Sequence, residues 1–227
     1  MVPMTQLECD AILFDLDGVL IDSTACIARH WREWAGQHGL EVAAIMQVAH
    51  GIRTVETIRL VAPHLDAEEE AARFTASEVV DTEGVVEIEG ASVLLNALPA
   101  DVWAVVTSGS KELATVRLRR AGLPIPRTLV TADDVKKGKP APEPYLVAAK
   151  RIGVAAARCA VVEDALAGIE AAHAAGMQVI AIATTHSRDE LAGRELVIDR
   201  LSALHVAPGE GGGCRLVIQV EQEVDHE

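Results

Sequence analysis

The chain has 227 residues, half of them hydrophobic, and a formal net charge of −14 from 34 acidic and 20 basic residues. This length predicts one large domain or a core with a smaller inserted one, and the acidic balance argues against a nucleic-acid-binding surface. There is no apolar run of membrane-spanning length and no secretory signal pattern, and the cysteines lack paired spacing, so the sequence predicts a cytoplasmic protein with free buried thiols at Cys9, Cys26, Cys159 and Cys214.

The first predicted strand is the apolar run over residues 11–14, and two aspartates follow it. A continuous apolar run is typical of a parallel strand buried on both faces. Asp15 and Asp17 leave the carboxyl end of this strand, where open α/β sheets bind ligands, and Gly18 lets the backbone turn sharply. Two carboxylates here suit a hard cation or a nucleophile beside a general acid. The simpler alternative is a strand-to-loop junction in which aspartate favours the turn.

Residues 23–86 have helical patterns with no strand between them. Ile27, Trp31 and Trp34 are spaced as on one face of a helix over 24–38, which Gly39 is placed to end. Capping residues and prolines indicate three further helices, over 42–49, 54–61 and 66–80. The pattern predicts a helical module inserted after the first strand.

From residue 90 onward strands and helices alternate. Strands are predicted over 102–106, 128–131, 159–162, 177–183 and 196–198, and helices over 91–98, 111–121, 143–152 and 165–175. This alternation predicts an α/β fold, with a doubly wound (Rossmann-like) parallel sheet as the core. The expected domains are a core of residues 1–22 and 87–209, the inserted helical module of residues 23–86, and a C-terminal extension of residues 210–227. In the extension, residues 216–220 are a candidate added strand, and the acidic end is expected to fray.

Polar residues follow two later strands at the same edge of the sheet. Ser108 and Gly109 precede one helix, and Glu163 and Asp164 precede another. A hydroxyl and helix-opening amides suit a phosphate, while Asp164 opposite the first aspartates suits a divalent cation. Lys139 is placed to balance the carboxylates. Each group alone has an ordinary explanation, such as an N-cap or a solvated lysine, but their complementary types at one edge favour a site.

The chain resembles the haloacid dehalogenase-like (HAD) superfamily of phosphohydrolases over about residues 8–207. The resemblance is carried by four motifs in order, Phe14-Asp15-Leu16-Asp17-Gly18, Val106-Thr107-Ser108-Gly109, Gly138-Lys139-Pro140 and Val162-Glu163-Asp164-Ala165-Leu166-Ala167-Gly168. The inserted helices resemble the α-helical cap of the β-phosphoglucomutase-like branch. The residues around His50-Gly51 are similar to those of bacterial sugar phosphatases and of fungal 2-deoxyglucose-6-phosphate and glycerol-3-phosphate phosphatases.

This resemblance implies a role for each motif residue. Asp15 attacks phosphorus to form an aspartyl-phosphate, and Asp17 protonates the leaving group and then activates water. The implied phosphate-binding residues are Asp15, Asp17, Gly18, Ser108, Gly109 and Lys139, of which Ser108 and Lys139 also assist catalysis. Mg²⁺ is expected on Asp15, the backbone carbonyl of Asp17 and Asp164, with Glu163 at or beside the ion.

Residues between the cap helices are candidates for reading the substrate. In the similar proteins the loop around His50 and Arg53 faces the site. Arg53 is a candidate partner for a substrate hydroxyl or a second anionic group, and the alternative is a solvent-facing arginine. His50 is a candidate substrate contact, although a structural part is favoured. Trp31 and Trp34 are expected in the core of the cap.

The sequence therefore predicts a Mg²⁺-dependent phosphatase that acts on small sugar or polyol phosphates as a monomer or weak dimer. A small phosphorylated metabolite is its expected partner. A β-phosphoglucomutase-like phosphosugar mutase is the alternative enzyme, because it shares every core motif. A catalytically silent phosphate-binding protein is less favoured, since Asp15, Asp17, Lys139 and Asp164 are all present. Dehalogenases of the superfamily need no acid two residues after the nucleophile, so Asp17 favours phosphoryl chemistry.

Overall fold

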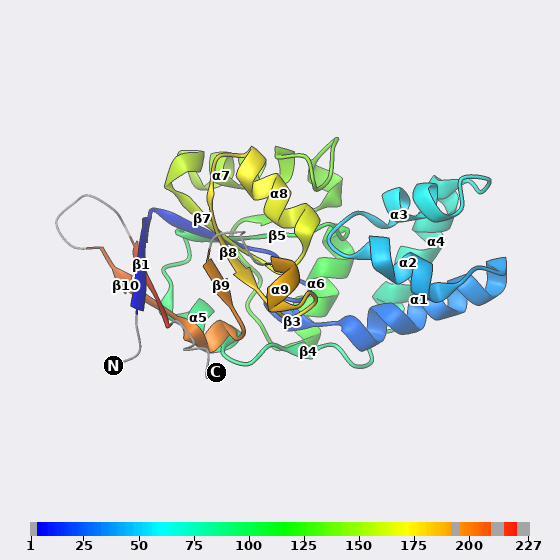
Figure 1. Cartoon of the computed structure of the whole chain (residues 1–227), viewed down its shortest axis with the longest axis horizontal. Coiled ribbons are helices and arrows are strands. Elements are labelled where there is room, and N and C mark those ends of the chain that lie inside the picture. Colours follow the sequence, from blue (N-terminus) through cyan, green and yellow to red (C-terminus); the bar gives the residue numbers. More distant parts are fainter. Residues whose placement is uncertain (1–3, 192–195, 210–215, 222–227) are drawn as a thin grey trace.

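A six-stranded parallel sheet lies at the centre of the computed structural model, which describes residues 4–191, 196–209 and 216–221 (Figure 1). The strand order is β6-β5-β2-β7-β8-β9. The strands are β2 (Ala11–Phe14), β5 (Trp103–Val106), β6 (Leu129–Val130), β7 (Cys159–Glu163), β8 (Gln178–Ile182) and β9 (Leu196–Ile198). β2 pairs in parallel on both sides, with Ile12 opposite Trp103 and Ala160. The predicted α/β fold with a doubly wound sheet is confirmed.

Helices cover both faces of this sheet. Successive strand residues point to opposite faces, so Phe14 of β2 packs into one hydrophobic cluster and Leu13 into the other. The first cluster includes side chains from α5 (Ala91–Ala97) and α6 (Lys111–Arg120). The second includes side chains from α7 (Glu143–Ile152), α8 (Leu166–Ala174) and the short α9 (Arg188–Leu191). Burial on both faces explains why the central strands are continuous apolar runs.

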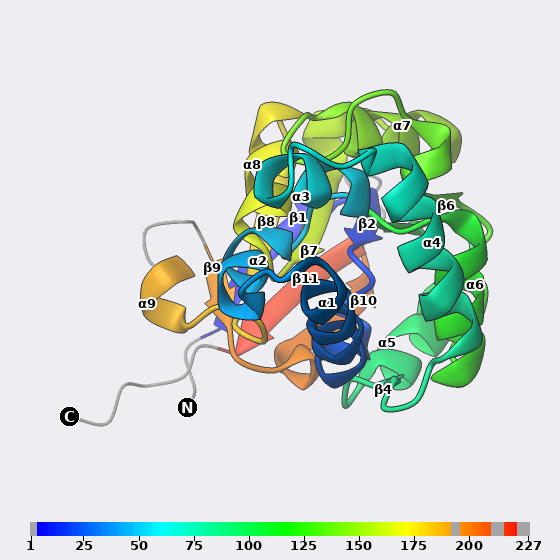
Figure 2. The same cartoon turned by 90° about the vertical axis from the view of Figure 1, so that its right-hand side faces the viewer.

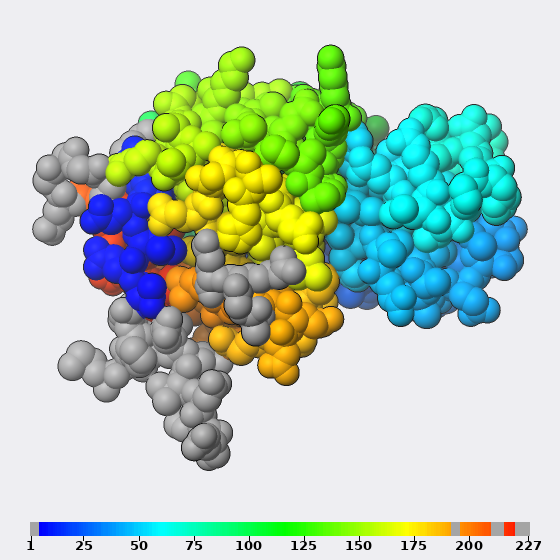
Figure 3. Space-filling model, turned by 45° about the horizontal axis from the view of Figure 1, so that its top comes forward, coloured from blue at the N-terminus to red at the C-terminus, as the bar shows by residue number. Residues whose placement is uncertain are grey.

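The inserted module has four helices, and it lies at one end of the core as a separate lobe (Figures 1 and 3). These are α1 (Thr24–His38), α2 (Val42–Ala49), α3 (Thr54–Val61) and α4 (Ala67–Val80). They share a hydrophobic cluster in which the rings of Trp31 and Phe74 lie 4.2 Å apart. Gly39 ends α1 with φ of 66°, and Asp66 caps α4. The predicted helices are confirmed, and we call this module the cap below.

A two-stranded antiparallel ribbon joins the cap to the core. It pairs β3 (Ile21–Asp22) with β4 (Val86–Glu87). Neither strand was predicted from the sequence, because two residues are too few to show a periodic pattern. The chain enters and leaves the cap through neighbouring strands, so both covalent connections to the core lie side by side.

A second sheet extends the core at the end away from the cap (Figure 1). It is antiparallel, in the order β1-β11-β10, with β1 (Met4–Cys9), β10 (Leu204–Pro208) and β11 (Leu216–Glu221). The predicted strand over residues 216–220 is therefore present as the central strand, and Ile218 is fully buried.

Some predictions concern residues beyond these elements. Residues 210–215, with Cys214, and the acidic residues 222–227 lie outside the described part of the chain. The other three cysteines are buried free thiols. No helix among the described residues is both long and apolar enough to cross a membrane.

Candidate active site

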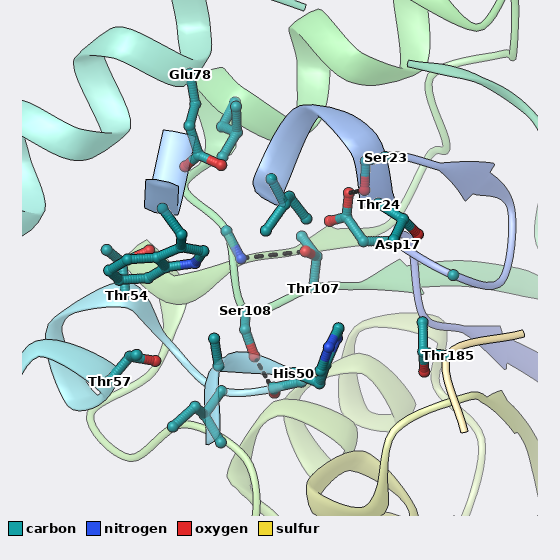
Figure 4. A pocket seen from close by; sticks show the side chains of 18 of the residues that line it. Asp17, Ser23, Thr24, His50, Thr54, Thr57, Glu78, Thr107, Ser108 and Thr185 are labelled. Carbon is teal, nitrogen blue, oxygen red and sulfur yellow. Dashed lines mark hydrogen bonds between the residues drawn. The ribbon is translucent and has the colours of Figure 1, made fainter. Parts of the chain in front are cut away.

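Polar residues that follow four strands of the parallel sheet line one pocket between the core and the cap. The carboxyl ends of parallel strands share an edge, so residues far apart in sequence meet there. The core contributes Asp15, Asp17, Ser108, Asp164 and Thr185, and the cap side contributes Thr24, His50, Thr54, Thr57 and Glu78. Figure 4 shows these residues around the pocket, except for Asp15 and Asp164, which it does not label. The pocket therefore has one wall from each lobe.

Asp15, directly after β2, is 5% exposed and forms a buried ion pair with Lys139. The Nζ of Lys139 lies 2.5 Å from Oδ1 of Asp15 and also donates to the carbonyl of Val106 at 3.2 Å. Burial raises the pKa of Asp15 to about 7, and the charge of Lys139 offsets part of that rise. Burial disfavours the charged lysine, but the neighbouring carboxylates outweigh this effect and raise the pKa of Lys139. The lysine is therefore cationic at neutral pH, beside the candidate nucleophile.

Glu163, the last residue of β7, uses both carboxylate oxygens within the protein. Its Oε1 accepts hydrogen bonds from Lys139 at 2.6 Å and from the hydroxyl of Tyr145 at 2.9 Å. Its Oε2 accepts from the backbone N–H groups of Asp164 and Ala165 at 2.9 and 3.0 Å. This arrangement favours a part for Glu163 in orienting Lys139 over direct binding of a metal.

Asp164 has the features of a metal ligand. Its Oδ2 accepts a hydrogen bond from Thr185 at 2.6 Å, while its buried Oδ1 has no partner among the described residues. Oxygens of Asp15, Glu163 and Asp164 lie within 4.8 Å of one another. Burial, reinforced by the other two carboxylates, raises the pKa of Asp164 well above its usual value. Three ionised carboxylates and Lys139 sum to a formal charge of −2 (−3 plus +1), which a divalent cation neutralises. The residues fit Mg²⁺.

Gly18 provides the space in which Asp164 approaches the turn after β2. Its φ is +86°, which side chains rarely adopt, and an added Cβ would lie 2.0 Å from Oδ2 of Asp164. The carbonyl of Gly18 also accepts a hydrogen bond from the hydroxyl of Thr184 at 2.5 Å. Both the turn and the close approach therefore require glycine.

Asp17 is held by groups from both lobes. Its Oδ1 accepts from the hydroxyl of Ser23, at the start of α1, at 2.6 Å and from Nη1 of Arg117, on α6, at 2.8 Å. Nη2 of Arg117 donates to Oε1 of Glu78, on α4 of the cap, at 2.7 Å. The candidate general acid is thus connected to the start of α1 through Ser23 and to α4 through one buried arginine.

Ser108 and Gly109, the predicted phosphate-binding residues, line the pocket, where Ser108 contacts the cap. The hydroxyl of Ser108 donates to the carbonyl of Gly51 at 2.8 Å (Figure 4). The N–H of Gly109 lies 3.1 Å from Oγ1 of Thr107. An added Cβ on Gly51 would lie 2.6 Å from that of Ala165, so the cap loop sits directly on the core.

The two cap residues predicted to read the substrate lie in different places. His50 lines the pocket, with its ring 5.9 Å from that of His186. Burial, and then the charge of His186, lower the pKa of His50, so it is neutral at pH 7. Arg53 pairs with Glu56 on its own helix and lies over Gly138, lining an adjoining cleft that shares Thr54, Ser108 and Gly109 with the pocket. His50 therefore lines the pocket itself, whereas Arg53 lines the cleft next to it.

Sequence reasoning did not single out Arg117 or Glu78. Arg117 lies on the buried face of α6, together with Leu113, Ala114 and Leu118. Glu78 similarly follows the buried Phe74 by one turn of α4. A charged residue in an apolar stripe is the signal that would have identified both.

Comparison with known proteins gives a consistent result. The chain matches the family model described as haloacid dehalogenase-like hydrolase over residues 12–182. It is 39% identical over 211 residues to hexitol phosphatase A of Escherichia coli (strain K12), covering 91% of this chain and 98% of that protein. It is also 39% identical over 198 residues to glycerol-1-phosphate phosphohydrolase 2 of Saccharomyces cerevisiae, covering 82% of this chain and 79% of that protein. A solved structure of a hydrolase from Pseudomonas syringae superposes with a TM-score of 0.73 at 27% identity, covering 83% of this chain and 92% of that one.

Proposed function

Because this chain belongs to the haloacid dehalogenase-like hydrolases, we propose that it is a Mg²⁺-dependent phosphatase for monophosphate esters of small polyols or sugars. The observation that carries the proposal is the buried Asp15–Lys139 pair beside Asp164, at the edge of a pocket that Asp17 also lines. The relatives named as hexitol and glycerol-1-phosphate phosphatases support the substrate class.

Asp15 is the nucleophile in the first step. Lys139 occupies its Oδ1, so within the described part of the chain Oδ2 is the oxygen without a hydrogen bond. Oδ2 attacks phosphorus, the bond between phosphorus and the ester oxygen breaks, and that oxygen keeps the electron pair. Asp17 gives its proton to the departing oxygen, which leaves as an alcohol.

Water completes the reaction in the second step. Asp17, now a carboxylate, takes a proton as water attacks phosphorus. The bond between phosphorus and Asp15 breaks, and inorganic phosphate and the free Asp15 carboxylate result. Lys139 stays cationic throughout and offsets negative charge on Asp15 and on the phosphoryl oxygens.

Mg²⁺, when bound, screens the phosphate dianion from the carboxylates. Asp15 and Asp164 would hold it, with the backbone carbonyl of Asp17, and the unpartnered Oδ1 of Asp164 is the strongest support for this ligand set.

The residues that line the pocket favour a substrate whose leaving group carries no charge. Arg117 is the only lysine or arginine among the described residues that line it, and its guanidinium already binds two carboxylates. The cap side instead offers the hydroxyls of Thr24, Thr54 and Thr57. A second phosphate would therefore meet no free cation, whereas a polyol finds hydrogen-bonding partners. This argues against the mutase, which must retain a bisphosphate.

Phosphate release from a panel of esters tests the proposal. The panel contains a hexitol phosphate, a glycerol phosphate, a 2-deoxyhexose 6-phosphate and a sugar bisphosphate, each with Mg²⁺ and with EDTA. We expect Mg²⁺-dependent release from the monoesters, with kcat/KM at least about tenfold lower for the bisphosphate. Conversion of β-glucose 1-phosphate to glucose 6-phosphate without phosphate release would contradict the proposal in favour of the mutase.

A further inference from the structure

A buried ion triad connects the cap to the candidate general acid. Arg117 on α6 is 3% exposed and donates to Asp17 at 2.8 Å and to Glu78 at 2.7 Å. Glu78 lies on α4 and is 4% exposed. α4 and α6 pack against each other where cap and core meet (Figure 2). One guanidinium therefore binds a carboxylate of each lobe.

Stability alone explains this triad poorly. Burial raises the pKa of Glu78 to about 7, and Arg117 offsets only part of the effect. The Nε of Arg117 is buried and has no hydrogen-bond partner in the part of the chain that the structure describes. Buried ion pairs with unsatisfied groups are often no more stabilising than apolar side chains of similar volume. The arrangement therefore points to a function at Asp17.

The hydrogen bonds of Asp17 fix how its carboxylate is turned. Ser23 and Arg117 both donate to Oδ1, at 2.6 and 2.8 Å. Oδ2 makes no hydrogen bond with any described residue, and Asp17 lines the pocket. Oδ2 is thus the oxygen that carries a proton to the substrate. A carboxylate with one anchored oxygen presents the other in a fixed direction, which general acid catalysis requires.

We propose that Arg117 is a positioning residue for Asp17, and that Glu78 holds Arg117 in place only while the cap rests on the core. The inference rests on the proposed phosphatase reaction, in which Asp17 protonates the leaving oxygen. When the cap moves off the core, Glu78 withdraws and the guanidinium loses one of its two partners. The carboxylate of Asp17 is therefore held in its catalytic orientation when the cap encloses a substrate. It is held less firmly when the cap is open and water enters the site.

Two variants and a control separate positioning from stability. Arg117→Met combined with Glu78→Met replaces the ion pair by apolar side chains that keep the contact between α4 and α6 filled. Arg117→Lys keeps a buried cation but cannot bridge two carboxylates. Arg29→Met is the matched control, because it removes a 2.8 Å ion pair with Asp81 that does not touch Asp17.

Two esters provide the readout. For a hexitol phosphate, both test variants are expected to lower kcat by about 10- to 100-fold, with KM within about threefold of the wild-type value. The rate constant of the first-turnover burst of nitrophenolate from 4-nitrophenyl phosphate should stay within about threefold of the wild-type value, because nitrophenolate leaves without being protonated. Arg29→Met should change neither quantity.

The outcomes distinguish this inference from the function on which it rests. A folded double variant with wild-type kcat on the hexitol ester would overturn it, as would an equal loss in the nitrophenolate burst. If the double variant does not fold, Arg117→Lys carries the same comparison. Failure of the wild-type protein to release phosphate from any ester would instead refute the proposed function.

Discussion

Burial at Asp15 and Asp164 makes metal binding compete with protons. Burial raises the pKa of Asp15 to about 7 and that of Asp164 well above its usual value, so both bind protons more readily than exposed aspartates do. Mg²⁺ requires the ionised carboxylates. The metal and the proton therefore share the same oxygens.

We expect the apparent Kd for Mg²⁺ to fall by about tenfold or more between pH 6 and pH 8, because the ionised fraction of Asp15 rises from about one tenth to nine tenths. The metal-free protein binds a proton at Asp15 more tightly folded than unfolded. The contribution of Asp15 to the free energy of unfolding therefore falls as pH rises from about 4 to 7. Calorimetric titration at the two pH values checks the affinity, and an unchanged Kd would contradict this assignment of ligands.

Tyr145 anchors the carboxylate that orients Lys139. Its hydroxyl donates to Oε1 of Glu163 at 2.9 Å, and both side chains are fully buried. Tyr145→Phe should lower the free energy of unfolding by about 1–3 kcal/mol, because the acceptor is a carboxylate. Lys139 still binds Glu163, so kcat should fall less than about tenfold. Urea unfolding measures the first effect, and an unchanged free energy of unfolding would contradict the structure here.

Single residues differ in how well the sequence predicted them. Asp15, Lys139 and Asp164 stand in ordered motifs, and the structure brings them together. Arg117 and Glu78 meet only because α4 and α6 pack against each other, which no local pattern specifies. The motifs therefore predicted which core residues meet, whereas the contact between Arg117 and Glu78 required the three-dimensional structure.

At the scale of elements, the cap loop and the core touch through glycine. Gly51 has φ of +77°, and an added Cβ would lie 2.6 Å from the Cβ of Ala165. Gly39, at the end of α1, has φ of +66° but no atom within 4 Å of an added Cβ. Both glycines have a left-handed backbone that strains any other residue, and they differ in what surrounds them.

Gly51→Ala should therefore reduce kcat/KM by at least about tenfold, because the cap can no longer close fully over the pocket. Gly39→Ala should cost about 1–2 kcal/mol of stability and leave kcat/KM nearly unchanged. Steady-state kinetics on a hexitol phosphate compares them. Equal activity in the two variants would show that contact at Gly51 is not needed.

Elements with a clear period were predicted well, and paired strands far apart were not. The helices of the cap match their predicted spans because apolar spacing and caps are local signals. β1 and β10 were not predicted from the sequence. Both pair with β11, which lies far along the chain from β1 and is separated from β10 by residues 209–215. Their stability as strands comes from the sheet and not from their own sequence.

At the scale of the whole molecule, the second sheet closes the end of the core opposite the cap. Ile218 on β11 is fully buried in the same hydrophobic cluster as Phe14, whereas the adjacent Val217 is only half-buried on the other face. Ile218→Ala should lower the free energy of unfolding by about 2–4 kcal/mol, and Val217→Ala by clearly less. Similar small losses from both variants would show that this sheet adds little to the core. Catalysis by folded protein should not change, because the site lies at the other end.

The central claim is that Asp15 carries the phosphoryl group. Rapid acid quench of the Mg²⁺-loaded protein during turnover of a hexitol phosphate, followed by peptide mass spectrometry, measures this directly. We predict a phosphoryl adduct on Asp15 that requires Mg²⁺ and is absent from Asp15→Asn, together with loss of turnover in that variant. Asp10→Asn, just before the start of the same strand, should keep both. Turnover by Asp15→Asn, or an adduct on another residue, would contradict the account.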